Sequence, residues 1–94
     1  MLRQTKTNII GILEKTVEVL SKSEDFEDKH LVNEANVFLK YSHVESMLKV
    51  AAKHLFPKIS ERMQKDILQS ELTDAEIIIC DIESVQDELL EEEN

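Results

Sequence analysis

The chain contains 94 residues, a length that accommodates one domain and excludes a second independently folded core. One Gly and one Pro leave too few turn residues for β-hairpins, so the composition excludes an all-β fold and favours helices. The net charge of −9 argues against direct binding to nucleic acid or to an anionic membrane. We therefore expect residues 1–94 to form a single all-α interaction domain, a small antiparallel bundle of three or four helices.

The first predicted helix covers residues 7–21. Its apolar residues recur every three to four positions, as the buried face of an amphipathic helix requires. They are Ile9, Ile10, Leu13, Val17 and Leu20. The acidic cluster at residues 23–28 then predicts a loop and the start of a second helix, because carboxylates near a helix N-terminus bond free amides and oppose the positive end of the dipole.

Residues 27–55 contain neither Gly nor Pro and keep a helical spacing of apolar residues. Two interpretations are open for this segment. It forms one long helix, or it forms two helices that meet in its middle, where Ser42 and Glu45 have the spacing of a capping box. We favour the single long helix, and we expect it to end near Phe56 because Pro57 disfavours helical geometry in the residue before it.

The segment after Pro57 predicts two more helical stretches. The apolar residues of the first are Ile59, Met63 and Ile67. Thr73 and Glu76 form the clearest capping box in the chain, so the last helix is expected to begin there. Its apolar residues alternate spacings of three and four, the pattern of a short coiled-coil-like seam. The seam consists of Ala75, Ile78, Ile82, Val85 and Leu89. Residues 91–94 are expected to form a frayed acidic end.

The turn at residues 77–80 is apolar on every side, because Ile77, Ile79 and Cys80 point away from the seam. Such a turn has to be covered by its own bundle or by another chain. We therefore predict an apolar partner-binding surface on the last helix. The predicted set is Ile77, Ile78, Ile79, Ile82, Val85 and Leu89.

Acidic residues dominate the last third of the chain. From Asp66 to Asn94 there are eleven Asp and Glu residues and no Lys or Arg. This imbalance favours an acidic surface that meets a basic partner. The predicted acidic set is Asp81, Glu83, Asp87 and Glu88. Plain solubility and pairing with basic residues from earlier in the chain stay open as alternatives. Those basic residues are Lys40, Lys49, Lys53, Lys58, Arg62 and Lys65.

The sequence offers no pattern typical of catalysis, of a metal site or of a cofactor site. His30, His43 and His54 lie 13 and 11 residues apart, whereas helical metal sites place two His three or four residues apart. Cys80 has isoleucine and acidic neighbours, so we expect a buried structural cysteine rather than a nucleophile. One Gly cannot supply a Gly-rich phosphate loop. We predict a protein that is not an enzyme, binds no cofactor and has solvated histidines.

Cysteine usage and hydropathy indicate the compartment. A lone cysteine cannot close an intramolecular disulfide, and the first residues lead into no long apolar segment of a secretory signal. The longest apolar run, at residues 77–80, falls far short of the roughly 18 residues that a membrane span needs. The expectation is therefore an intracellular protein in a reducing compartment, the cytoplasm or nucleus, without a membrane span.

The main functional hypothesis is a subunit or adaptor of a larger assembly, in a homo- or hetero-oligomer. Its partner is expected to be another protein with a basic or apolar helical surface. The alternative is a small stand-alone inhibitor or immunity protein of phage or plasmid type, whose acidic face blocks a basic site on a nuclease or toxin. The length and expected helix count resemble those of bacteriocin immunity proteins, four-helix bundles that protect a producer cell, although those proteins are commonly basic.

Overall fold

Helices account for most of the chain in the computed structural model, which describes residues 1–68 and 73–93. In chain order they are α1 (Arg3–Leu20), α2 (Phe26–Lys40), α3 (Glu45–Val50), the π-helical turn η1 (Ala51–Leu55), α4 (Phe56–Leu68) and α5 (Thr73–Glu93). Because α3, η1 and α4 follow one another without a gap, they form one bent helix. The described residues therefore make four helices and no strand, which confirms the predicted all-α bundle of three or four helices.

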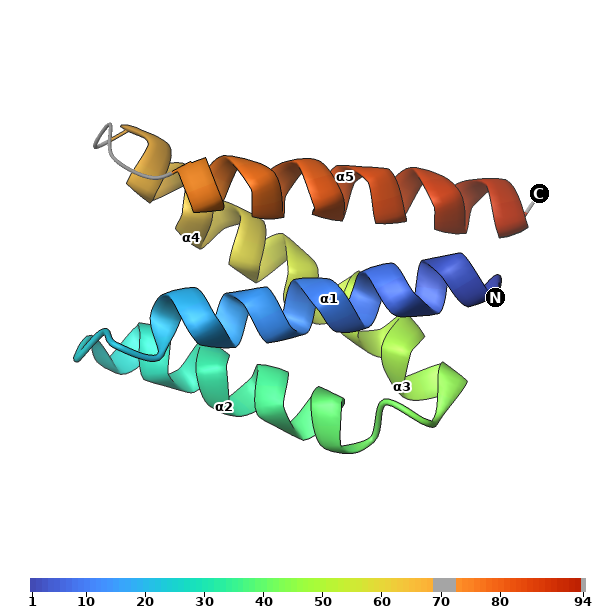
Figure 1. Ribbon diagram of the computed structural model, residues 1–94, viewed down its shortest axis with the longest axis horizontal. Coiled ribbons are helices and arrows are strands. Elements are labelled where there is room, and N and C mark those ends of the chain that lie inside the picture. The colour runs from blue at the N-terminus through green and yellow to red at the C-terminus, as the bar shows by residue number, and fades with distance from the viewer. Residues whose placement is uncertain (69–72, 94) are drawn as a thin grey trace.

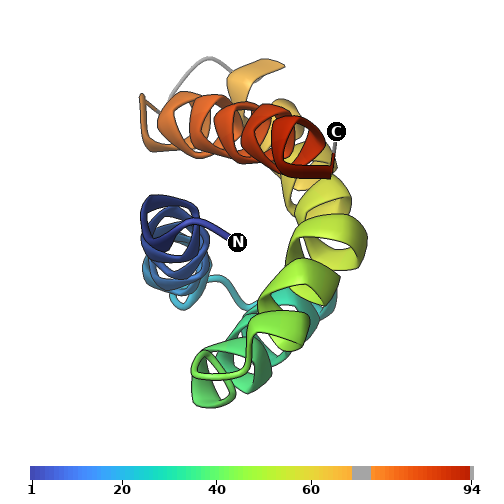
Figure 2. The same ribbon diagram turned by 90° about the vertical axis from the view of Figure 1, so that its right-hand side faces the viewer.

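The helices are arranged around α1 (Figures 1 and 2). α1 runs antiparallel to both α2 and α5, and it contacts α2, α3 and α5. Viewed along the bundle, α2, the bent helix and α5 form an arc, and α1 lies inside it. The radius of gyration is 12.8 Å, close to the value of about 12 Å expected for a compact domain of this length. The chain thus closes a core of its own.

Among the described residues, Phe56 is the only aromatic side chain in a core otherwise built from aliphatic side chains and Met63. α1 buries a wide face because helices lie on several sides of it, so Ile12 is buried as well as Ile9, Leu13 and Leu20 of the predicted stripe. The helix also begins earlier than predicted, at Arg3, and this extra turn brings Thr5 into the core. From the other helices, Leu48, Leu55, Phe56, Ile59 and Met63 are fully buried.

Gly11 lies on the exposed side of α1, and the fold does not require a glycine there. A Cβ atom added at this position would meet nothing within 4 Å. Glycine inside a helix costs about 0.5–1 kcal/mol relative to alanine, because it loses more backbone freedom on folding. We expect Gly11→Ala to raise the free energy of unfolding by about 0.5–1 kcal/mol in urea titrations. A lower value would contradict the conclusion that the fold does not require a glycine at this position.

The single long helix expected over residues 27–55 is wrong, because α2 ends at Lys40 and α3 begins at Glu45. The alternative of two helices is the one observed, although the Ser42 capping box does not form, since the N-cap of α3 is Val44 and has no side-chain cap hydrogen bond. The physical reason for the break is the packing of the whole bundle, which is shorter than a straight helix of this length. A straight helix of this length would measure roughly 43 Å. The longest dimension of the molecule is 37 Å. The turn folds the chain back so that Leu48 reaches the common core.

The expected helix end near Phe56 is also wrong. Phe56 has helical dihedral angles, φ −60° and ψ −38°, and α4 continues through Pro57. The π-helical turn before it explains this continuity. Proline cannot donate a backbone hydrogen bond, and its ring crowds the preceding turn. In η1 the bonding shifts by one residue, so that the Phe56 N–H donates to the Ala51 carbonyl, and the widened turn accommodates the proline.

α5 buries the face that its spacing predicts. Ala75, Ile78, Ile82 and Val85 are buried, and Leu89 is partly buried. α5 contacts both α4 and α1 of the same chain instead of a single partner helix, so the structure does not show the predicted coiled-coil-like seam. The helix begins at Thr73 as predicted, although the Thr73 side chain of the capping box lies outside the described residues. Of the end expected to fray, residues 91–93 are helical, and Asn94 lies outside the described residues.

Candidate functional site

The predicted apolar set on α5 divides between the core and the surface. Ile78, Ile82 and Val85 are at most 1% exposed and pack inside the chain's own bundle, so they are not accessible to a partner. Ile79 and Leu89 are partly buried, and Ile77 is 43% exposed. The turn at residues 77–80 is therefore covered by the bundle on one side only.

The predicted acidic set also divides, here between two faces of α5. Glu83 and Asp87, four residues apart, lie on the outer face and are exposed. Asp81 and Glu88 lie on the side of α5 that faces α1, where they line a hollow between the two helices. Glu88 accepts hydrogen bonds from Thr5 Oγ1 at 3.1 Å and from Asn8 Nδ2 at 3.5 Å. Its carboxylate thus stabilises the α1–α5 contact.

The outer face of α5, defined here by Glu76, Glu83, Asp87 and Glu91, carries four exposed carboxylates. The spacings of seven and four residues place them along one side of the helix. Like charges at these spacings repel one another and destabilise the isolated helix. Within the described residues, no Lys or Arg lies within 4 Å of an α5 carboxylate. Of the alternatives for the acidic last third, ion pairing with basic residues from earlier in the chain is thus not seen at α5 among the described residues.

A groove separates α5 from η1, with a volume of about 440 Å³. It is lined by Lys49, Ala52, Lys53, Gln86, Leu89 and Leu90. Its floor is apolar, and Leu90 in its wall is 60% exposed. Lys49 and Lys53, four residues apart, supply positive charge on the η1 side, and neither lies within 4 Å of a carboxylate among the described residues. Sequence reasoning missed Leu90, because this residue follows the predicted seam by one position and so falls outside its spacing.

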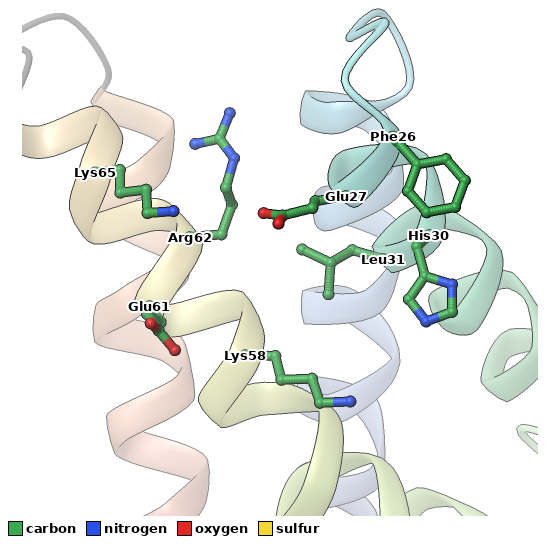
Figure 3. Close-up of a pocket in the computed structure, with 8 residues that line it drawn as sticks. All are labelled: Phe26, Glu27, His30, Leu31, Lys58, Glu61, Arg62 and Lys65. Carbon is green, nitrogen blue, oxygen red and sulfur yellow. The ribbon is translucent and has the colours of Figure 1, made fainter.

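A second hollow lies between α2 and α4 and has a volume of about 250 Å³ (Figure 3). It is lined by Phe26, Glu27, His30, Leu31, Lys58, Glu61, Arg62 and Lys65. The figure shows the side chains of α2 on one side and those of α4 on the other. Phe26 is 81% exposed, and both acidic and basic groups line the hollow, so its charge favours neither sign of ligand.

An ion pair joins α2 to α4 at this hollow. Arg62 Nε and Nη2 donate to Asp28 Oδ1 and Oδ2 at 2.6 and 3.0 Å, and Arg62 Nη1 donates to Asp66 Oδ1 at 2.6 Å. Ser23 Oγ donates to Asp28 Oδ2 at 2.7 Å. The Asp28 side chain is 1% exposed and that of Arg62 is 22% exposed. We call this group of four residues the Asp28–Arg62 clasp.

Hydrogen bonding within the clasp shifts the pKa of both partners toward the charged form. The bonds from Arg62 lower the pKa of Asp28 below its usual value, against the opposing effect of burial, and the Ser23 hydroxyl lowers it further. The same bonds to Asp28 raise the pKa of Arg62 above its usual value. Because Arg62 is engaged by two carboxylates, the clasp fixes α2 against α4 and leaves Arg62 unavailable to α5.

The remaining residues considered for chemistry lie apart. His30, His43 and His54 are all exposed, which confirms the prediction of solvated histidines. Cys80 is exposed as well, so the prediction of a buried structural cysteine is wrong, because Cys80 lies on the side of α5 opposite its packed face. In the parts of the chain that the structure describes, no three His, Cys, Asp or Glu side chains gather closely enough to hold a metal ion.

None of the helices in residues 1–68 and 73–93 combines the length and apolar character needed to cross a bilayer. Comparison with known proteins gives no family for the chain. No family model, no curated protein and no solved structure matches it. Any assignment of function therefore rests on the sequence and geometry of this protein itself.

Proposed function

We propose that this protein is a non-catalytic protein-binding module, a subunit or adaptor of a larger assembly, and that it binds through α5. The observation that carries the proposal is the outer face of α5. Its four carboxylates are exposed and have no Lys or Arg within 4 Å among the described residues. Such an arrangement costs stability by self-repulsion unless a positively charged surface offsets it.

The partner that fits this face is a protein with a basic or apolar helical surface. Exposed apolar side chains flank the carboxylates, with Ile77 43% exposed and Leu90 60% exposed. Apolar groups beside a charged patch combine the two contributions of a specific interface, since buried apolar area contributes affinity and complementary charge contributes association rate and specificity. The exposed charges act on the rate of association, because they steer the encounter over distances of about a Debye length.

Charge reversal on α5 tests this proposal. We expect Glu83→Lys/Asp87→Lys to slow association with a captured partner by about tenfold and to flatten its dependence on salt. The control is Glu24→Lys/Glu27→Lys, which makes the same change of net charge at exposed positions by the start of α2, at the other end of the arc from α5. Surface plasmon resonance at two salt concentrations would measure both. Equal effects of the two variants would contradict a role specific to α5.

A stand-alone inhibitor or immunity protein is the second candidate function, and one observation favours it. The chain closes a core from a single copy, with a radius of gyration of 12.8 Å, as a protein that acts alone requires. In that case the acidic face of α5 blocks a basic site on a nuclease or toxin. Light scattering at micromolar concentration separates the two, since a stable monomer favours the inhibitor and an oligomer favours the subunit.

We propose an intracellular location in a reducing compartment, the cytoplasm or nucleus. The exposed thiol of Cys80 supports this proposal. An exposed free thiol is prone to oxidation and disulfide exchange, and cytosolic glutathione and thioredoxin keep such groups reduced.

A further inference from the structure

The surface around the groove between η1 and α5 carries opposite charges on the two sides of Leu90. Lys49 and Lys53 supply the positive side from α3 and η1, and Leu90 lies in the apolar strip between the sides. Glu83 and Asp87 do not line the groove, but they supply negative charge on the same exposed face of α5 as Leu90, which they precede by seven and three residues. None of these four charged groups has an ion-pair partner within 4 Å in the described part of the chain.

We infer that this surface binds a second copy of the same chain, about a two-fold axis parallel to α5. The inference rests on the proposed function of α5 as a protein-binding helix and names its partner. In the dimer, Lys49 and Lys53 of each copy face Glu83 and Asp87 of the other, and the two Leu90 side chains meet near the axis. The two α5 helices run parallel.

Symmetry is the reason for choosing a second copy. A two-fold interface is self-complementary, so each residue pair occurs twice. A surface that is positive on one side of an apolar strip and negative on the other meets this condition. Rotation of one copy by half a turn about the strip places its positive side against the negative side of the other copy. A partner of one sign only would leave half of these four charges unmatched and desolvated, which costs binding free energy.

The net charge of −9 opposes the association of two copies but does not prevent it. At physiological salt, charges separated by more than about 8 Å are largely screened, whereas pairs in direct contact are screened far less. The repulsion between distant carboxylates therefore fades as salt rises, and the contacts across the strip persist. We expect the dimer to be weaker at low salt than at about 0.15 M salt.

A charge-swap experiment tests the dimer with the full chain. Sedimentation equilibrium should show dimers for the natural sequence, and monomers for both Lys49→Glu/Lys53→Glu and Glu83→Lys/Asp87→Lys, with association weakened at least about tenfold. A one-to-one mixture of the two variants should form dimers again, because every reversed charge then faces a reversed partner. The control Lys22→Glu/Lys29→Glu changes the net charge by the same amount as Lys49→Glu/Lys53→Glu, at exposed positions away from the groove, and should remain dimeric. Circular dichroism checks that each variant is folded.

Three results would overturn the inference. The first is that the natural sequence stays monomeric at about 100 micromolar or more. The second is that both charge-swap variants still form dimers. The third is that the two variants are monomeric and do not associate when they are mixed. The proposed function fails separately. If the natural chain is monomeric but its binding to a different, captured protein still depends on Glu83 and Asp87, the second copy is excluded while α5 keeps its role as a binding helix.

Discussion

Replacement of Ile82 by Ala should lower the free energy of unfolding by about 2–4 kcal/mol. Ile82 is 1% exposed on the inner face of α5, where this helix packs on both α1 and α4. The substitution removes buried methyl and methylene groups and leaves a cavity that a core of this density fills only in part. Urea titration followed by circular dichroism would measure the loss as a lower midpoint with an unchanged slope.

Ile77→Ala is the matched control for Ile82→Ala, because it makes the same chemical change on the same helix. Ile77 is 43% exposed, so its truncation removes little buried area and should cost less than about 1 kcal/mol. If the two variants lose equal stability, the assignment of inner and outer faces of α5 is incorrect. A loss of partner binding in Ile77→Ala with unchanged stability would support the proposed binding surface.

Periodicity was sufficient to predict most helices and their buried faces. Ile9, Leu13 and Leu20 in α1 and Ile78, Ile82 and Val85 in α5 are buried as their spacing predicts. This works because a helix repeats every 3.6 residues, so that the sequence itself records which side faces the core. The acidic start of α2 was equally predictable, since Asp25 caps it by accepting a hydrogen bond from the Glu27 backbone.

The helix breaks were not predictable, because they depend on the whole bundle. Nothing local in residues 41–44 forces a turn, and the capping box at Ser42 goes unused. The turn is favoured because the bent helix has to return along α1 and α5. Likewise, a proline interrupts a regular α-helix, but here the helix continues through Pro57 because a π-helical turn precedes it. No sequence rule indicates where such a turn forms.

The candidate site was predicted in part. Composition identifies α5 as acidic, but it does not show which carboxylates are free. Glu88 bonds Thr5 and Asn8 of α1, whereas Glu83 and Asp87 remain exposed. The groove with Lys49 and Leu90 and the Asp28–Arg62 clasp both bring together residues more than 30 positions apart, so only the tertiary structure reveals them.

Removal of the clasp arginine by Arg62→Met should cost about 3 kcal/mol at pH 7. The substitution keeps an apolar stem of similar length but leaves the Asp28 carboxylate, which is 1% exposed, with Ser23 as its remaining partner. An uncompensated buried charge is expensive, about 3–5 kcal/mol in buried pairs, and the partial exposure of Arg62 places the expected loss at the lower end. Asp66→Asn removes the charge of Asp66, whose side chain is 14% exposed, and keeps the Asp28–Arg62 pair, so it should cost less.

The pH dependence of this loss separates charge from packing. In the natural chain the pKa of Asp28 is lowered by Arg62, so the stabilisation is complete above the usual carboxyl pKa of about 4 and is lost as the pH falls through the lower native value. In Arg62→Met, burial instead raises the pKa of Asp28, so acidification neutralises the unpaired charge and removes its penalty. The difference in stability between the two proteins should therefore shrink as the pH falls from 7 to about 3, in parallel urea titrations. A difference that stays constant over this range would mean that Arg62 stabilises the bundle by packing its stem and not by its charge.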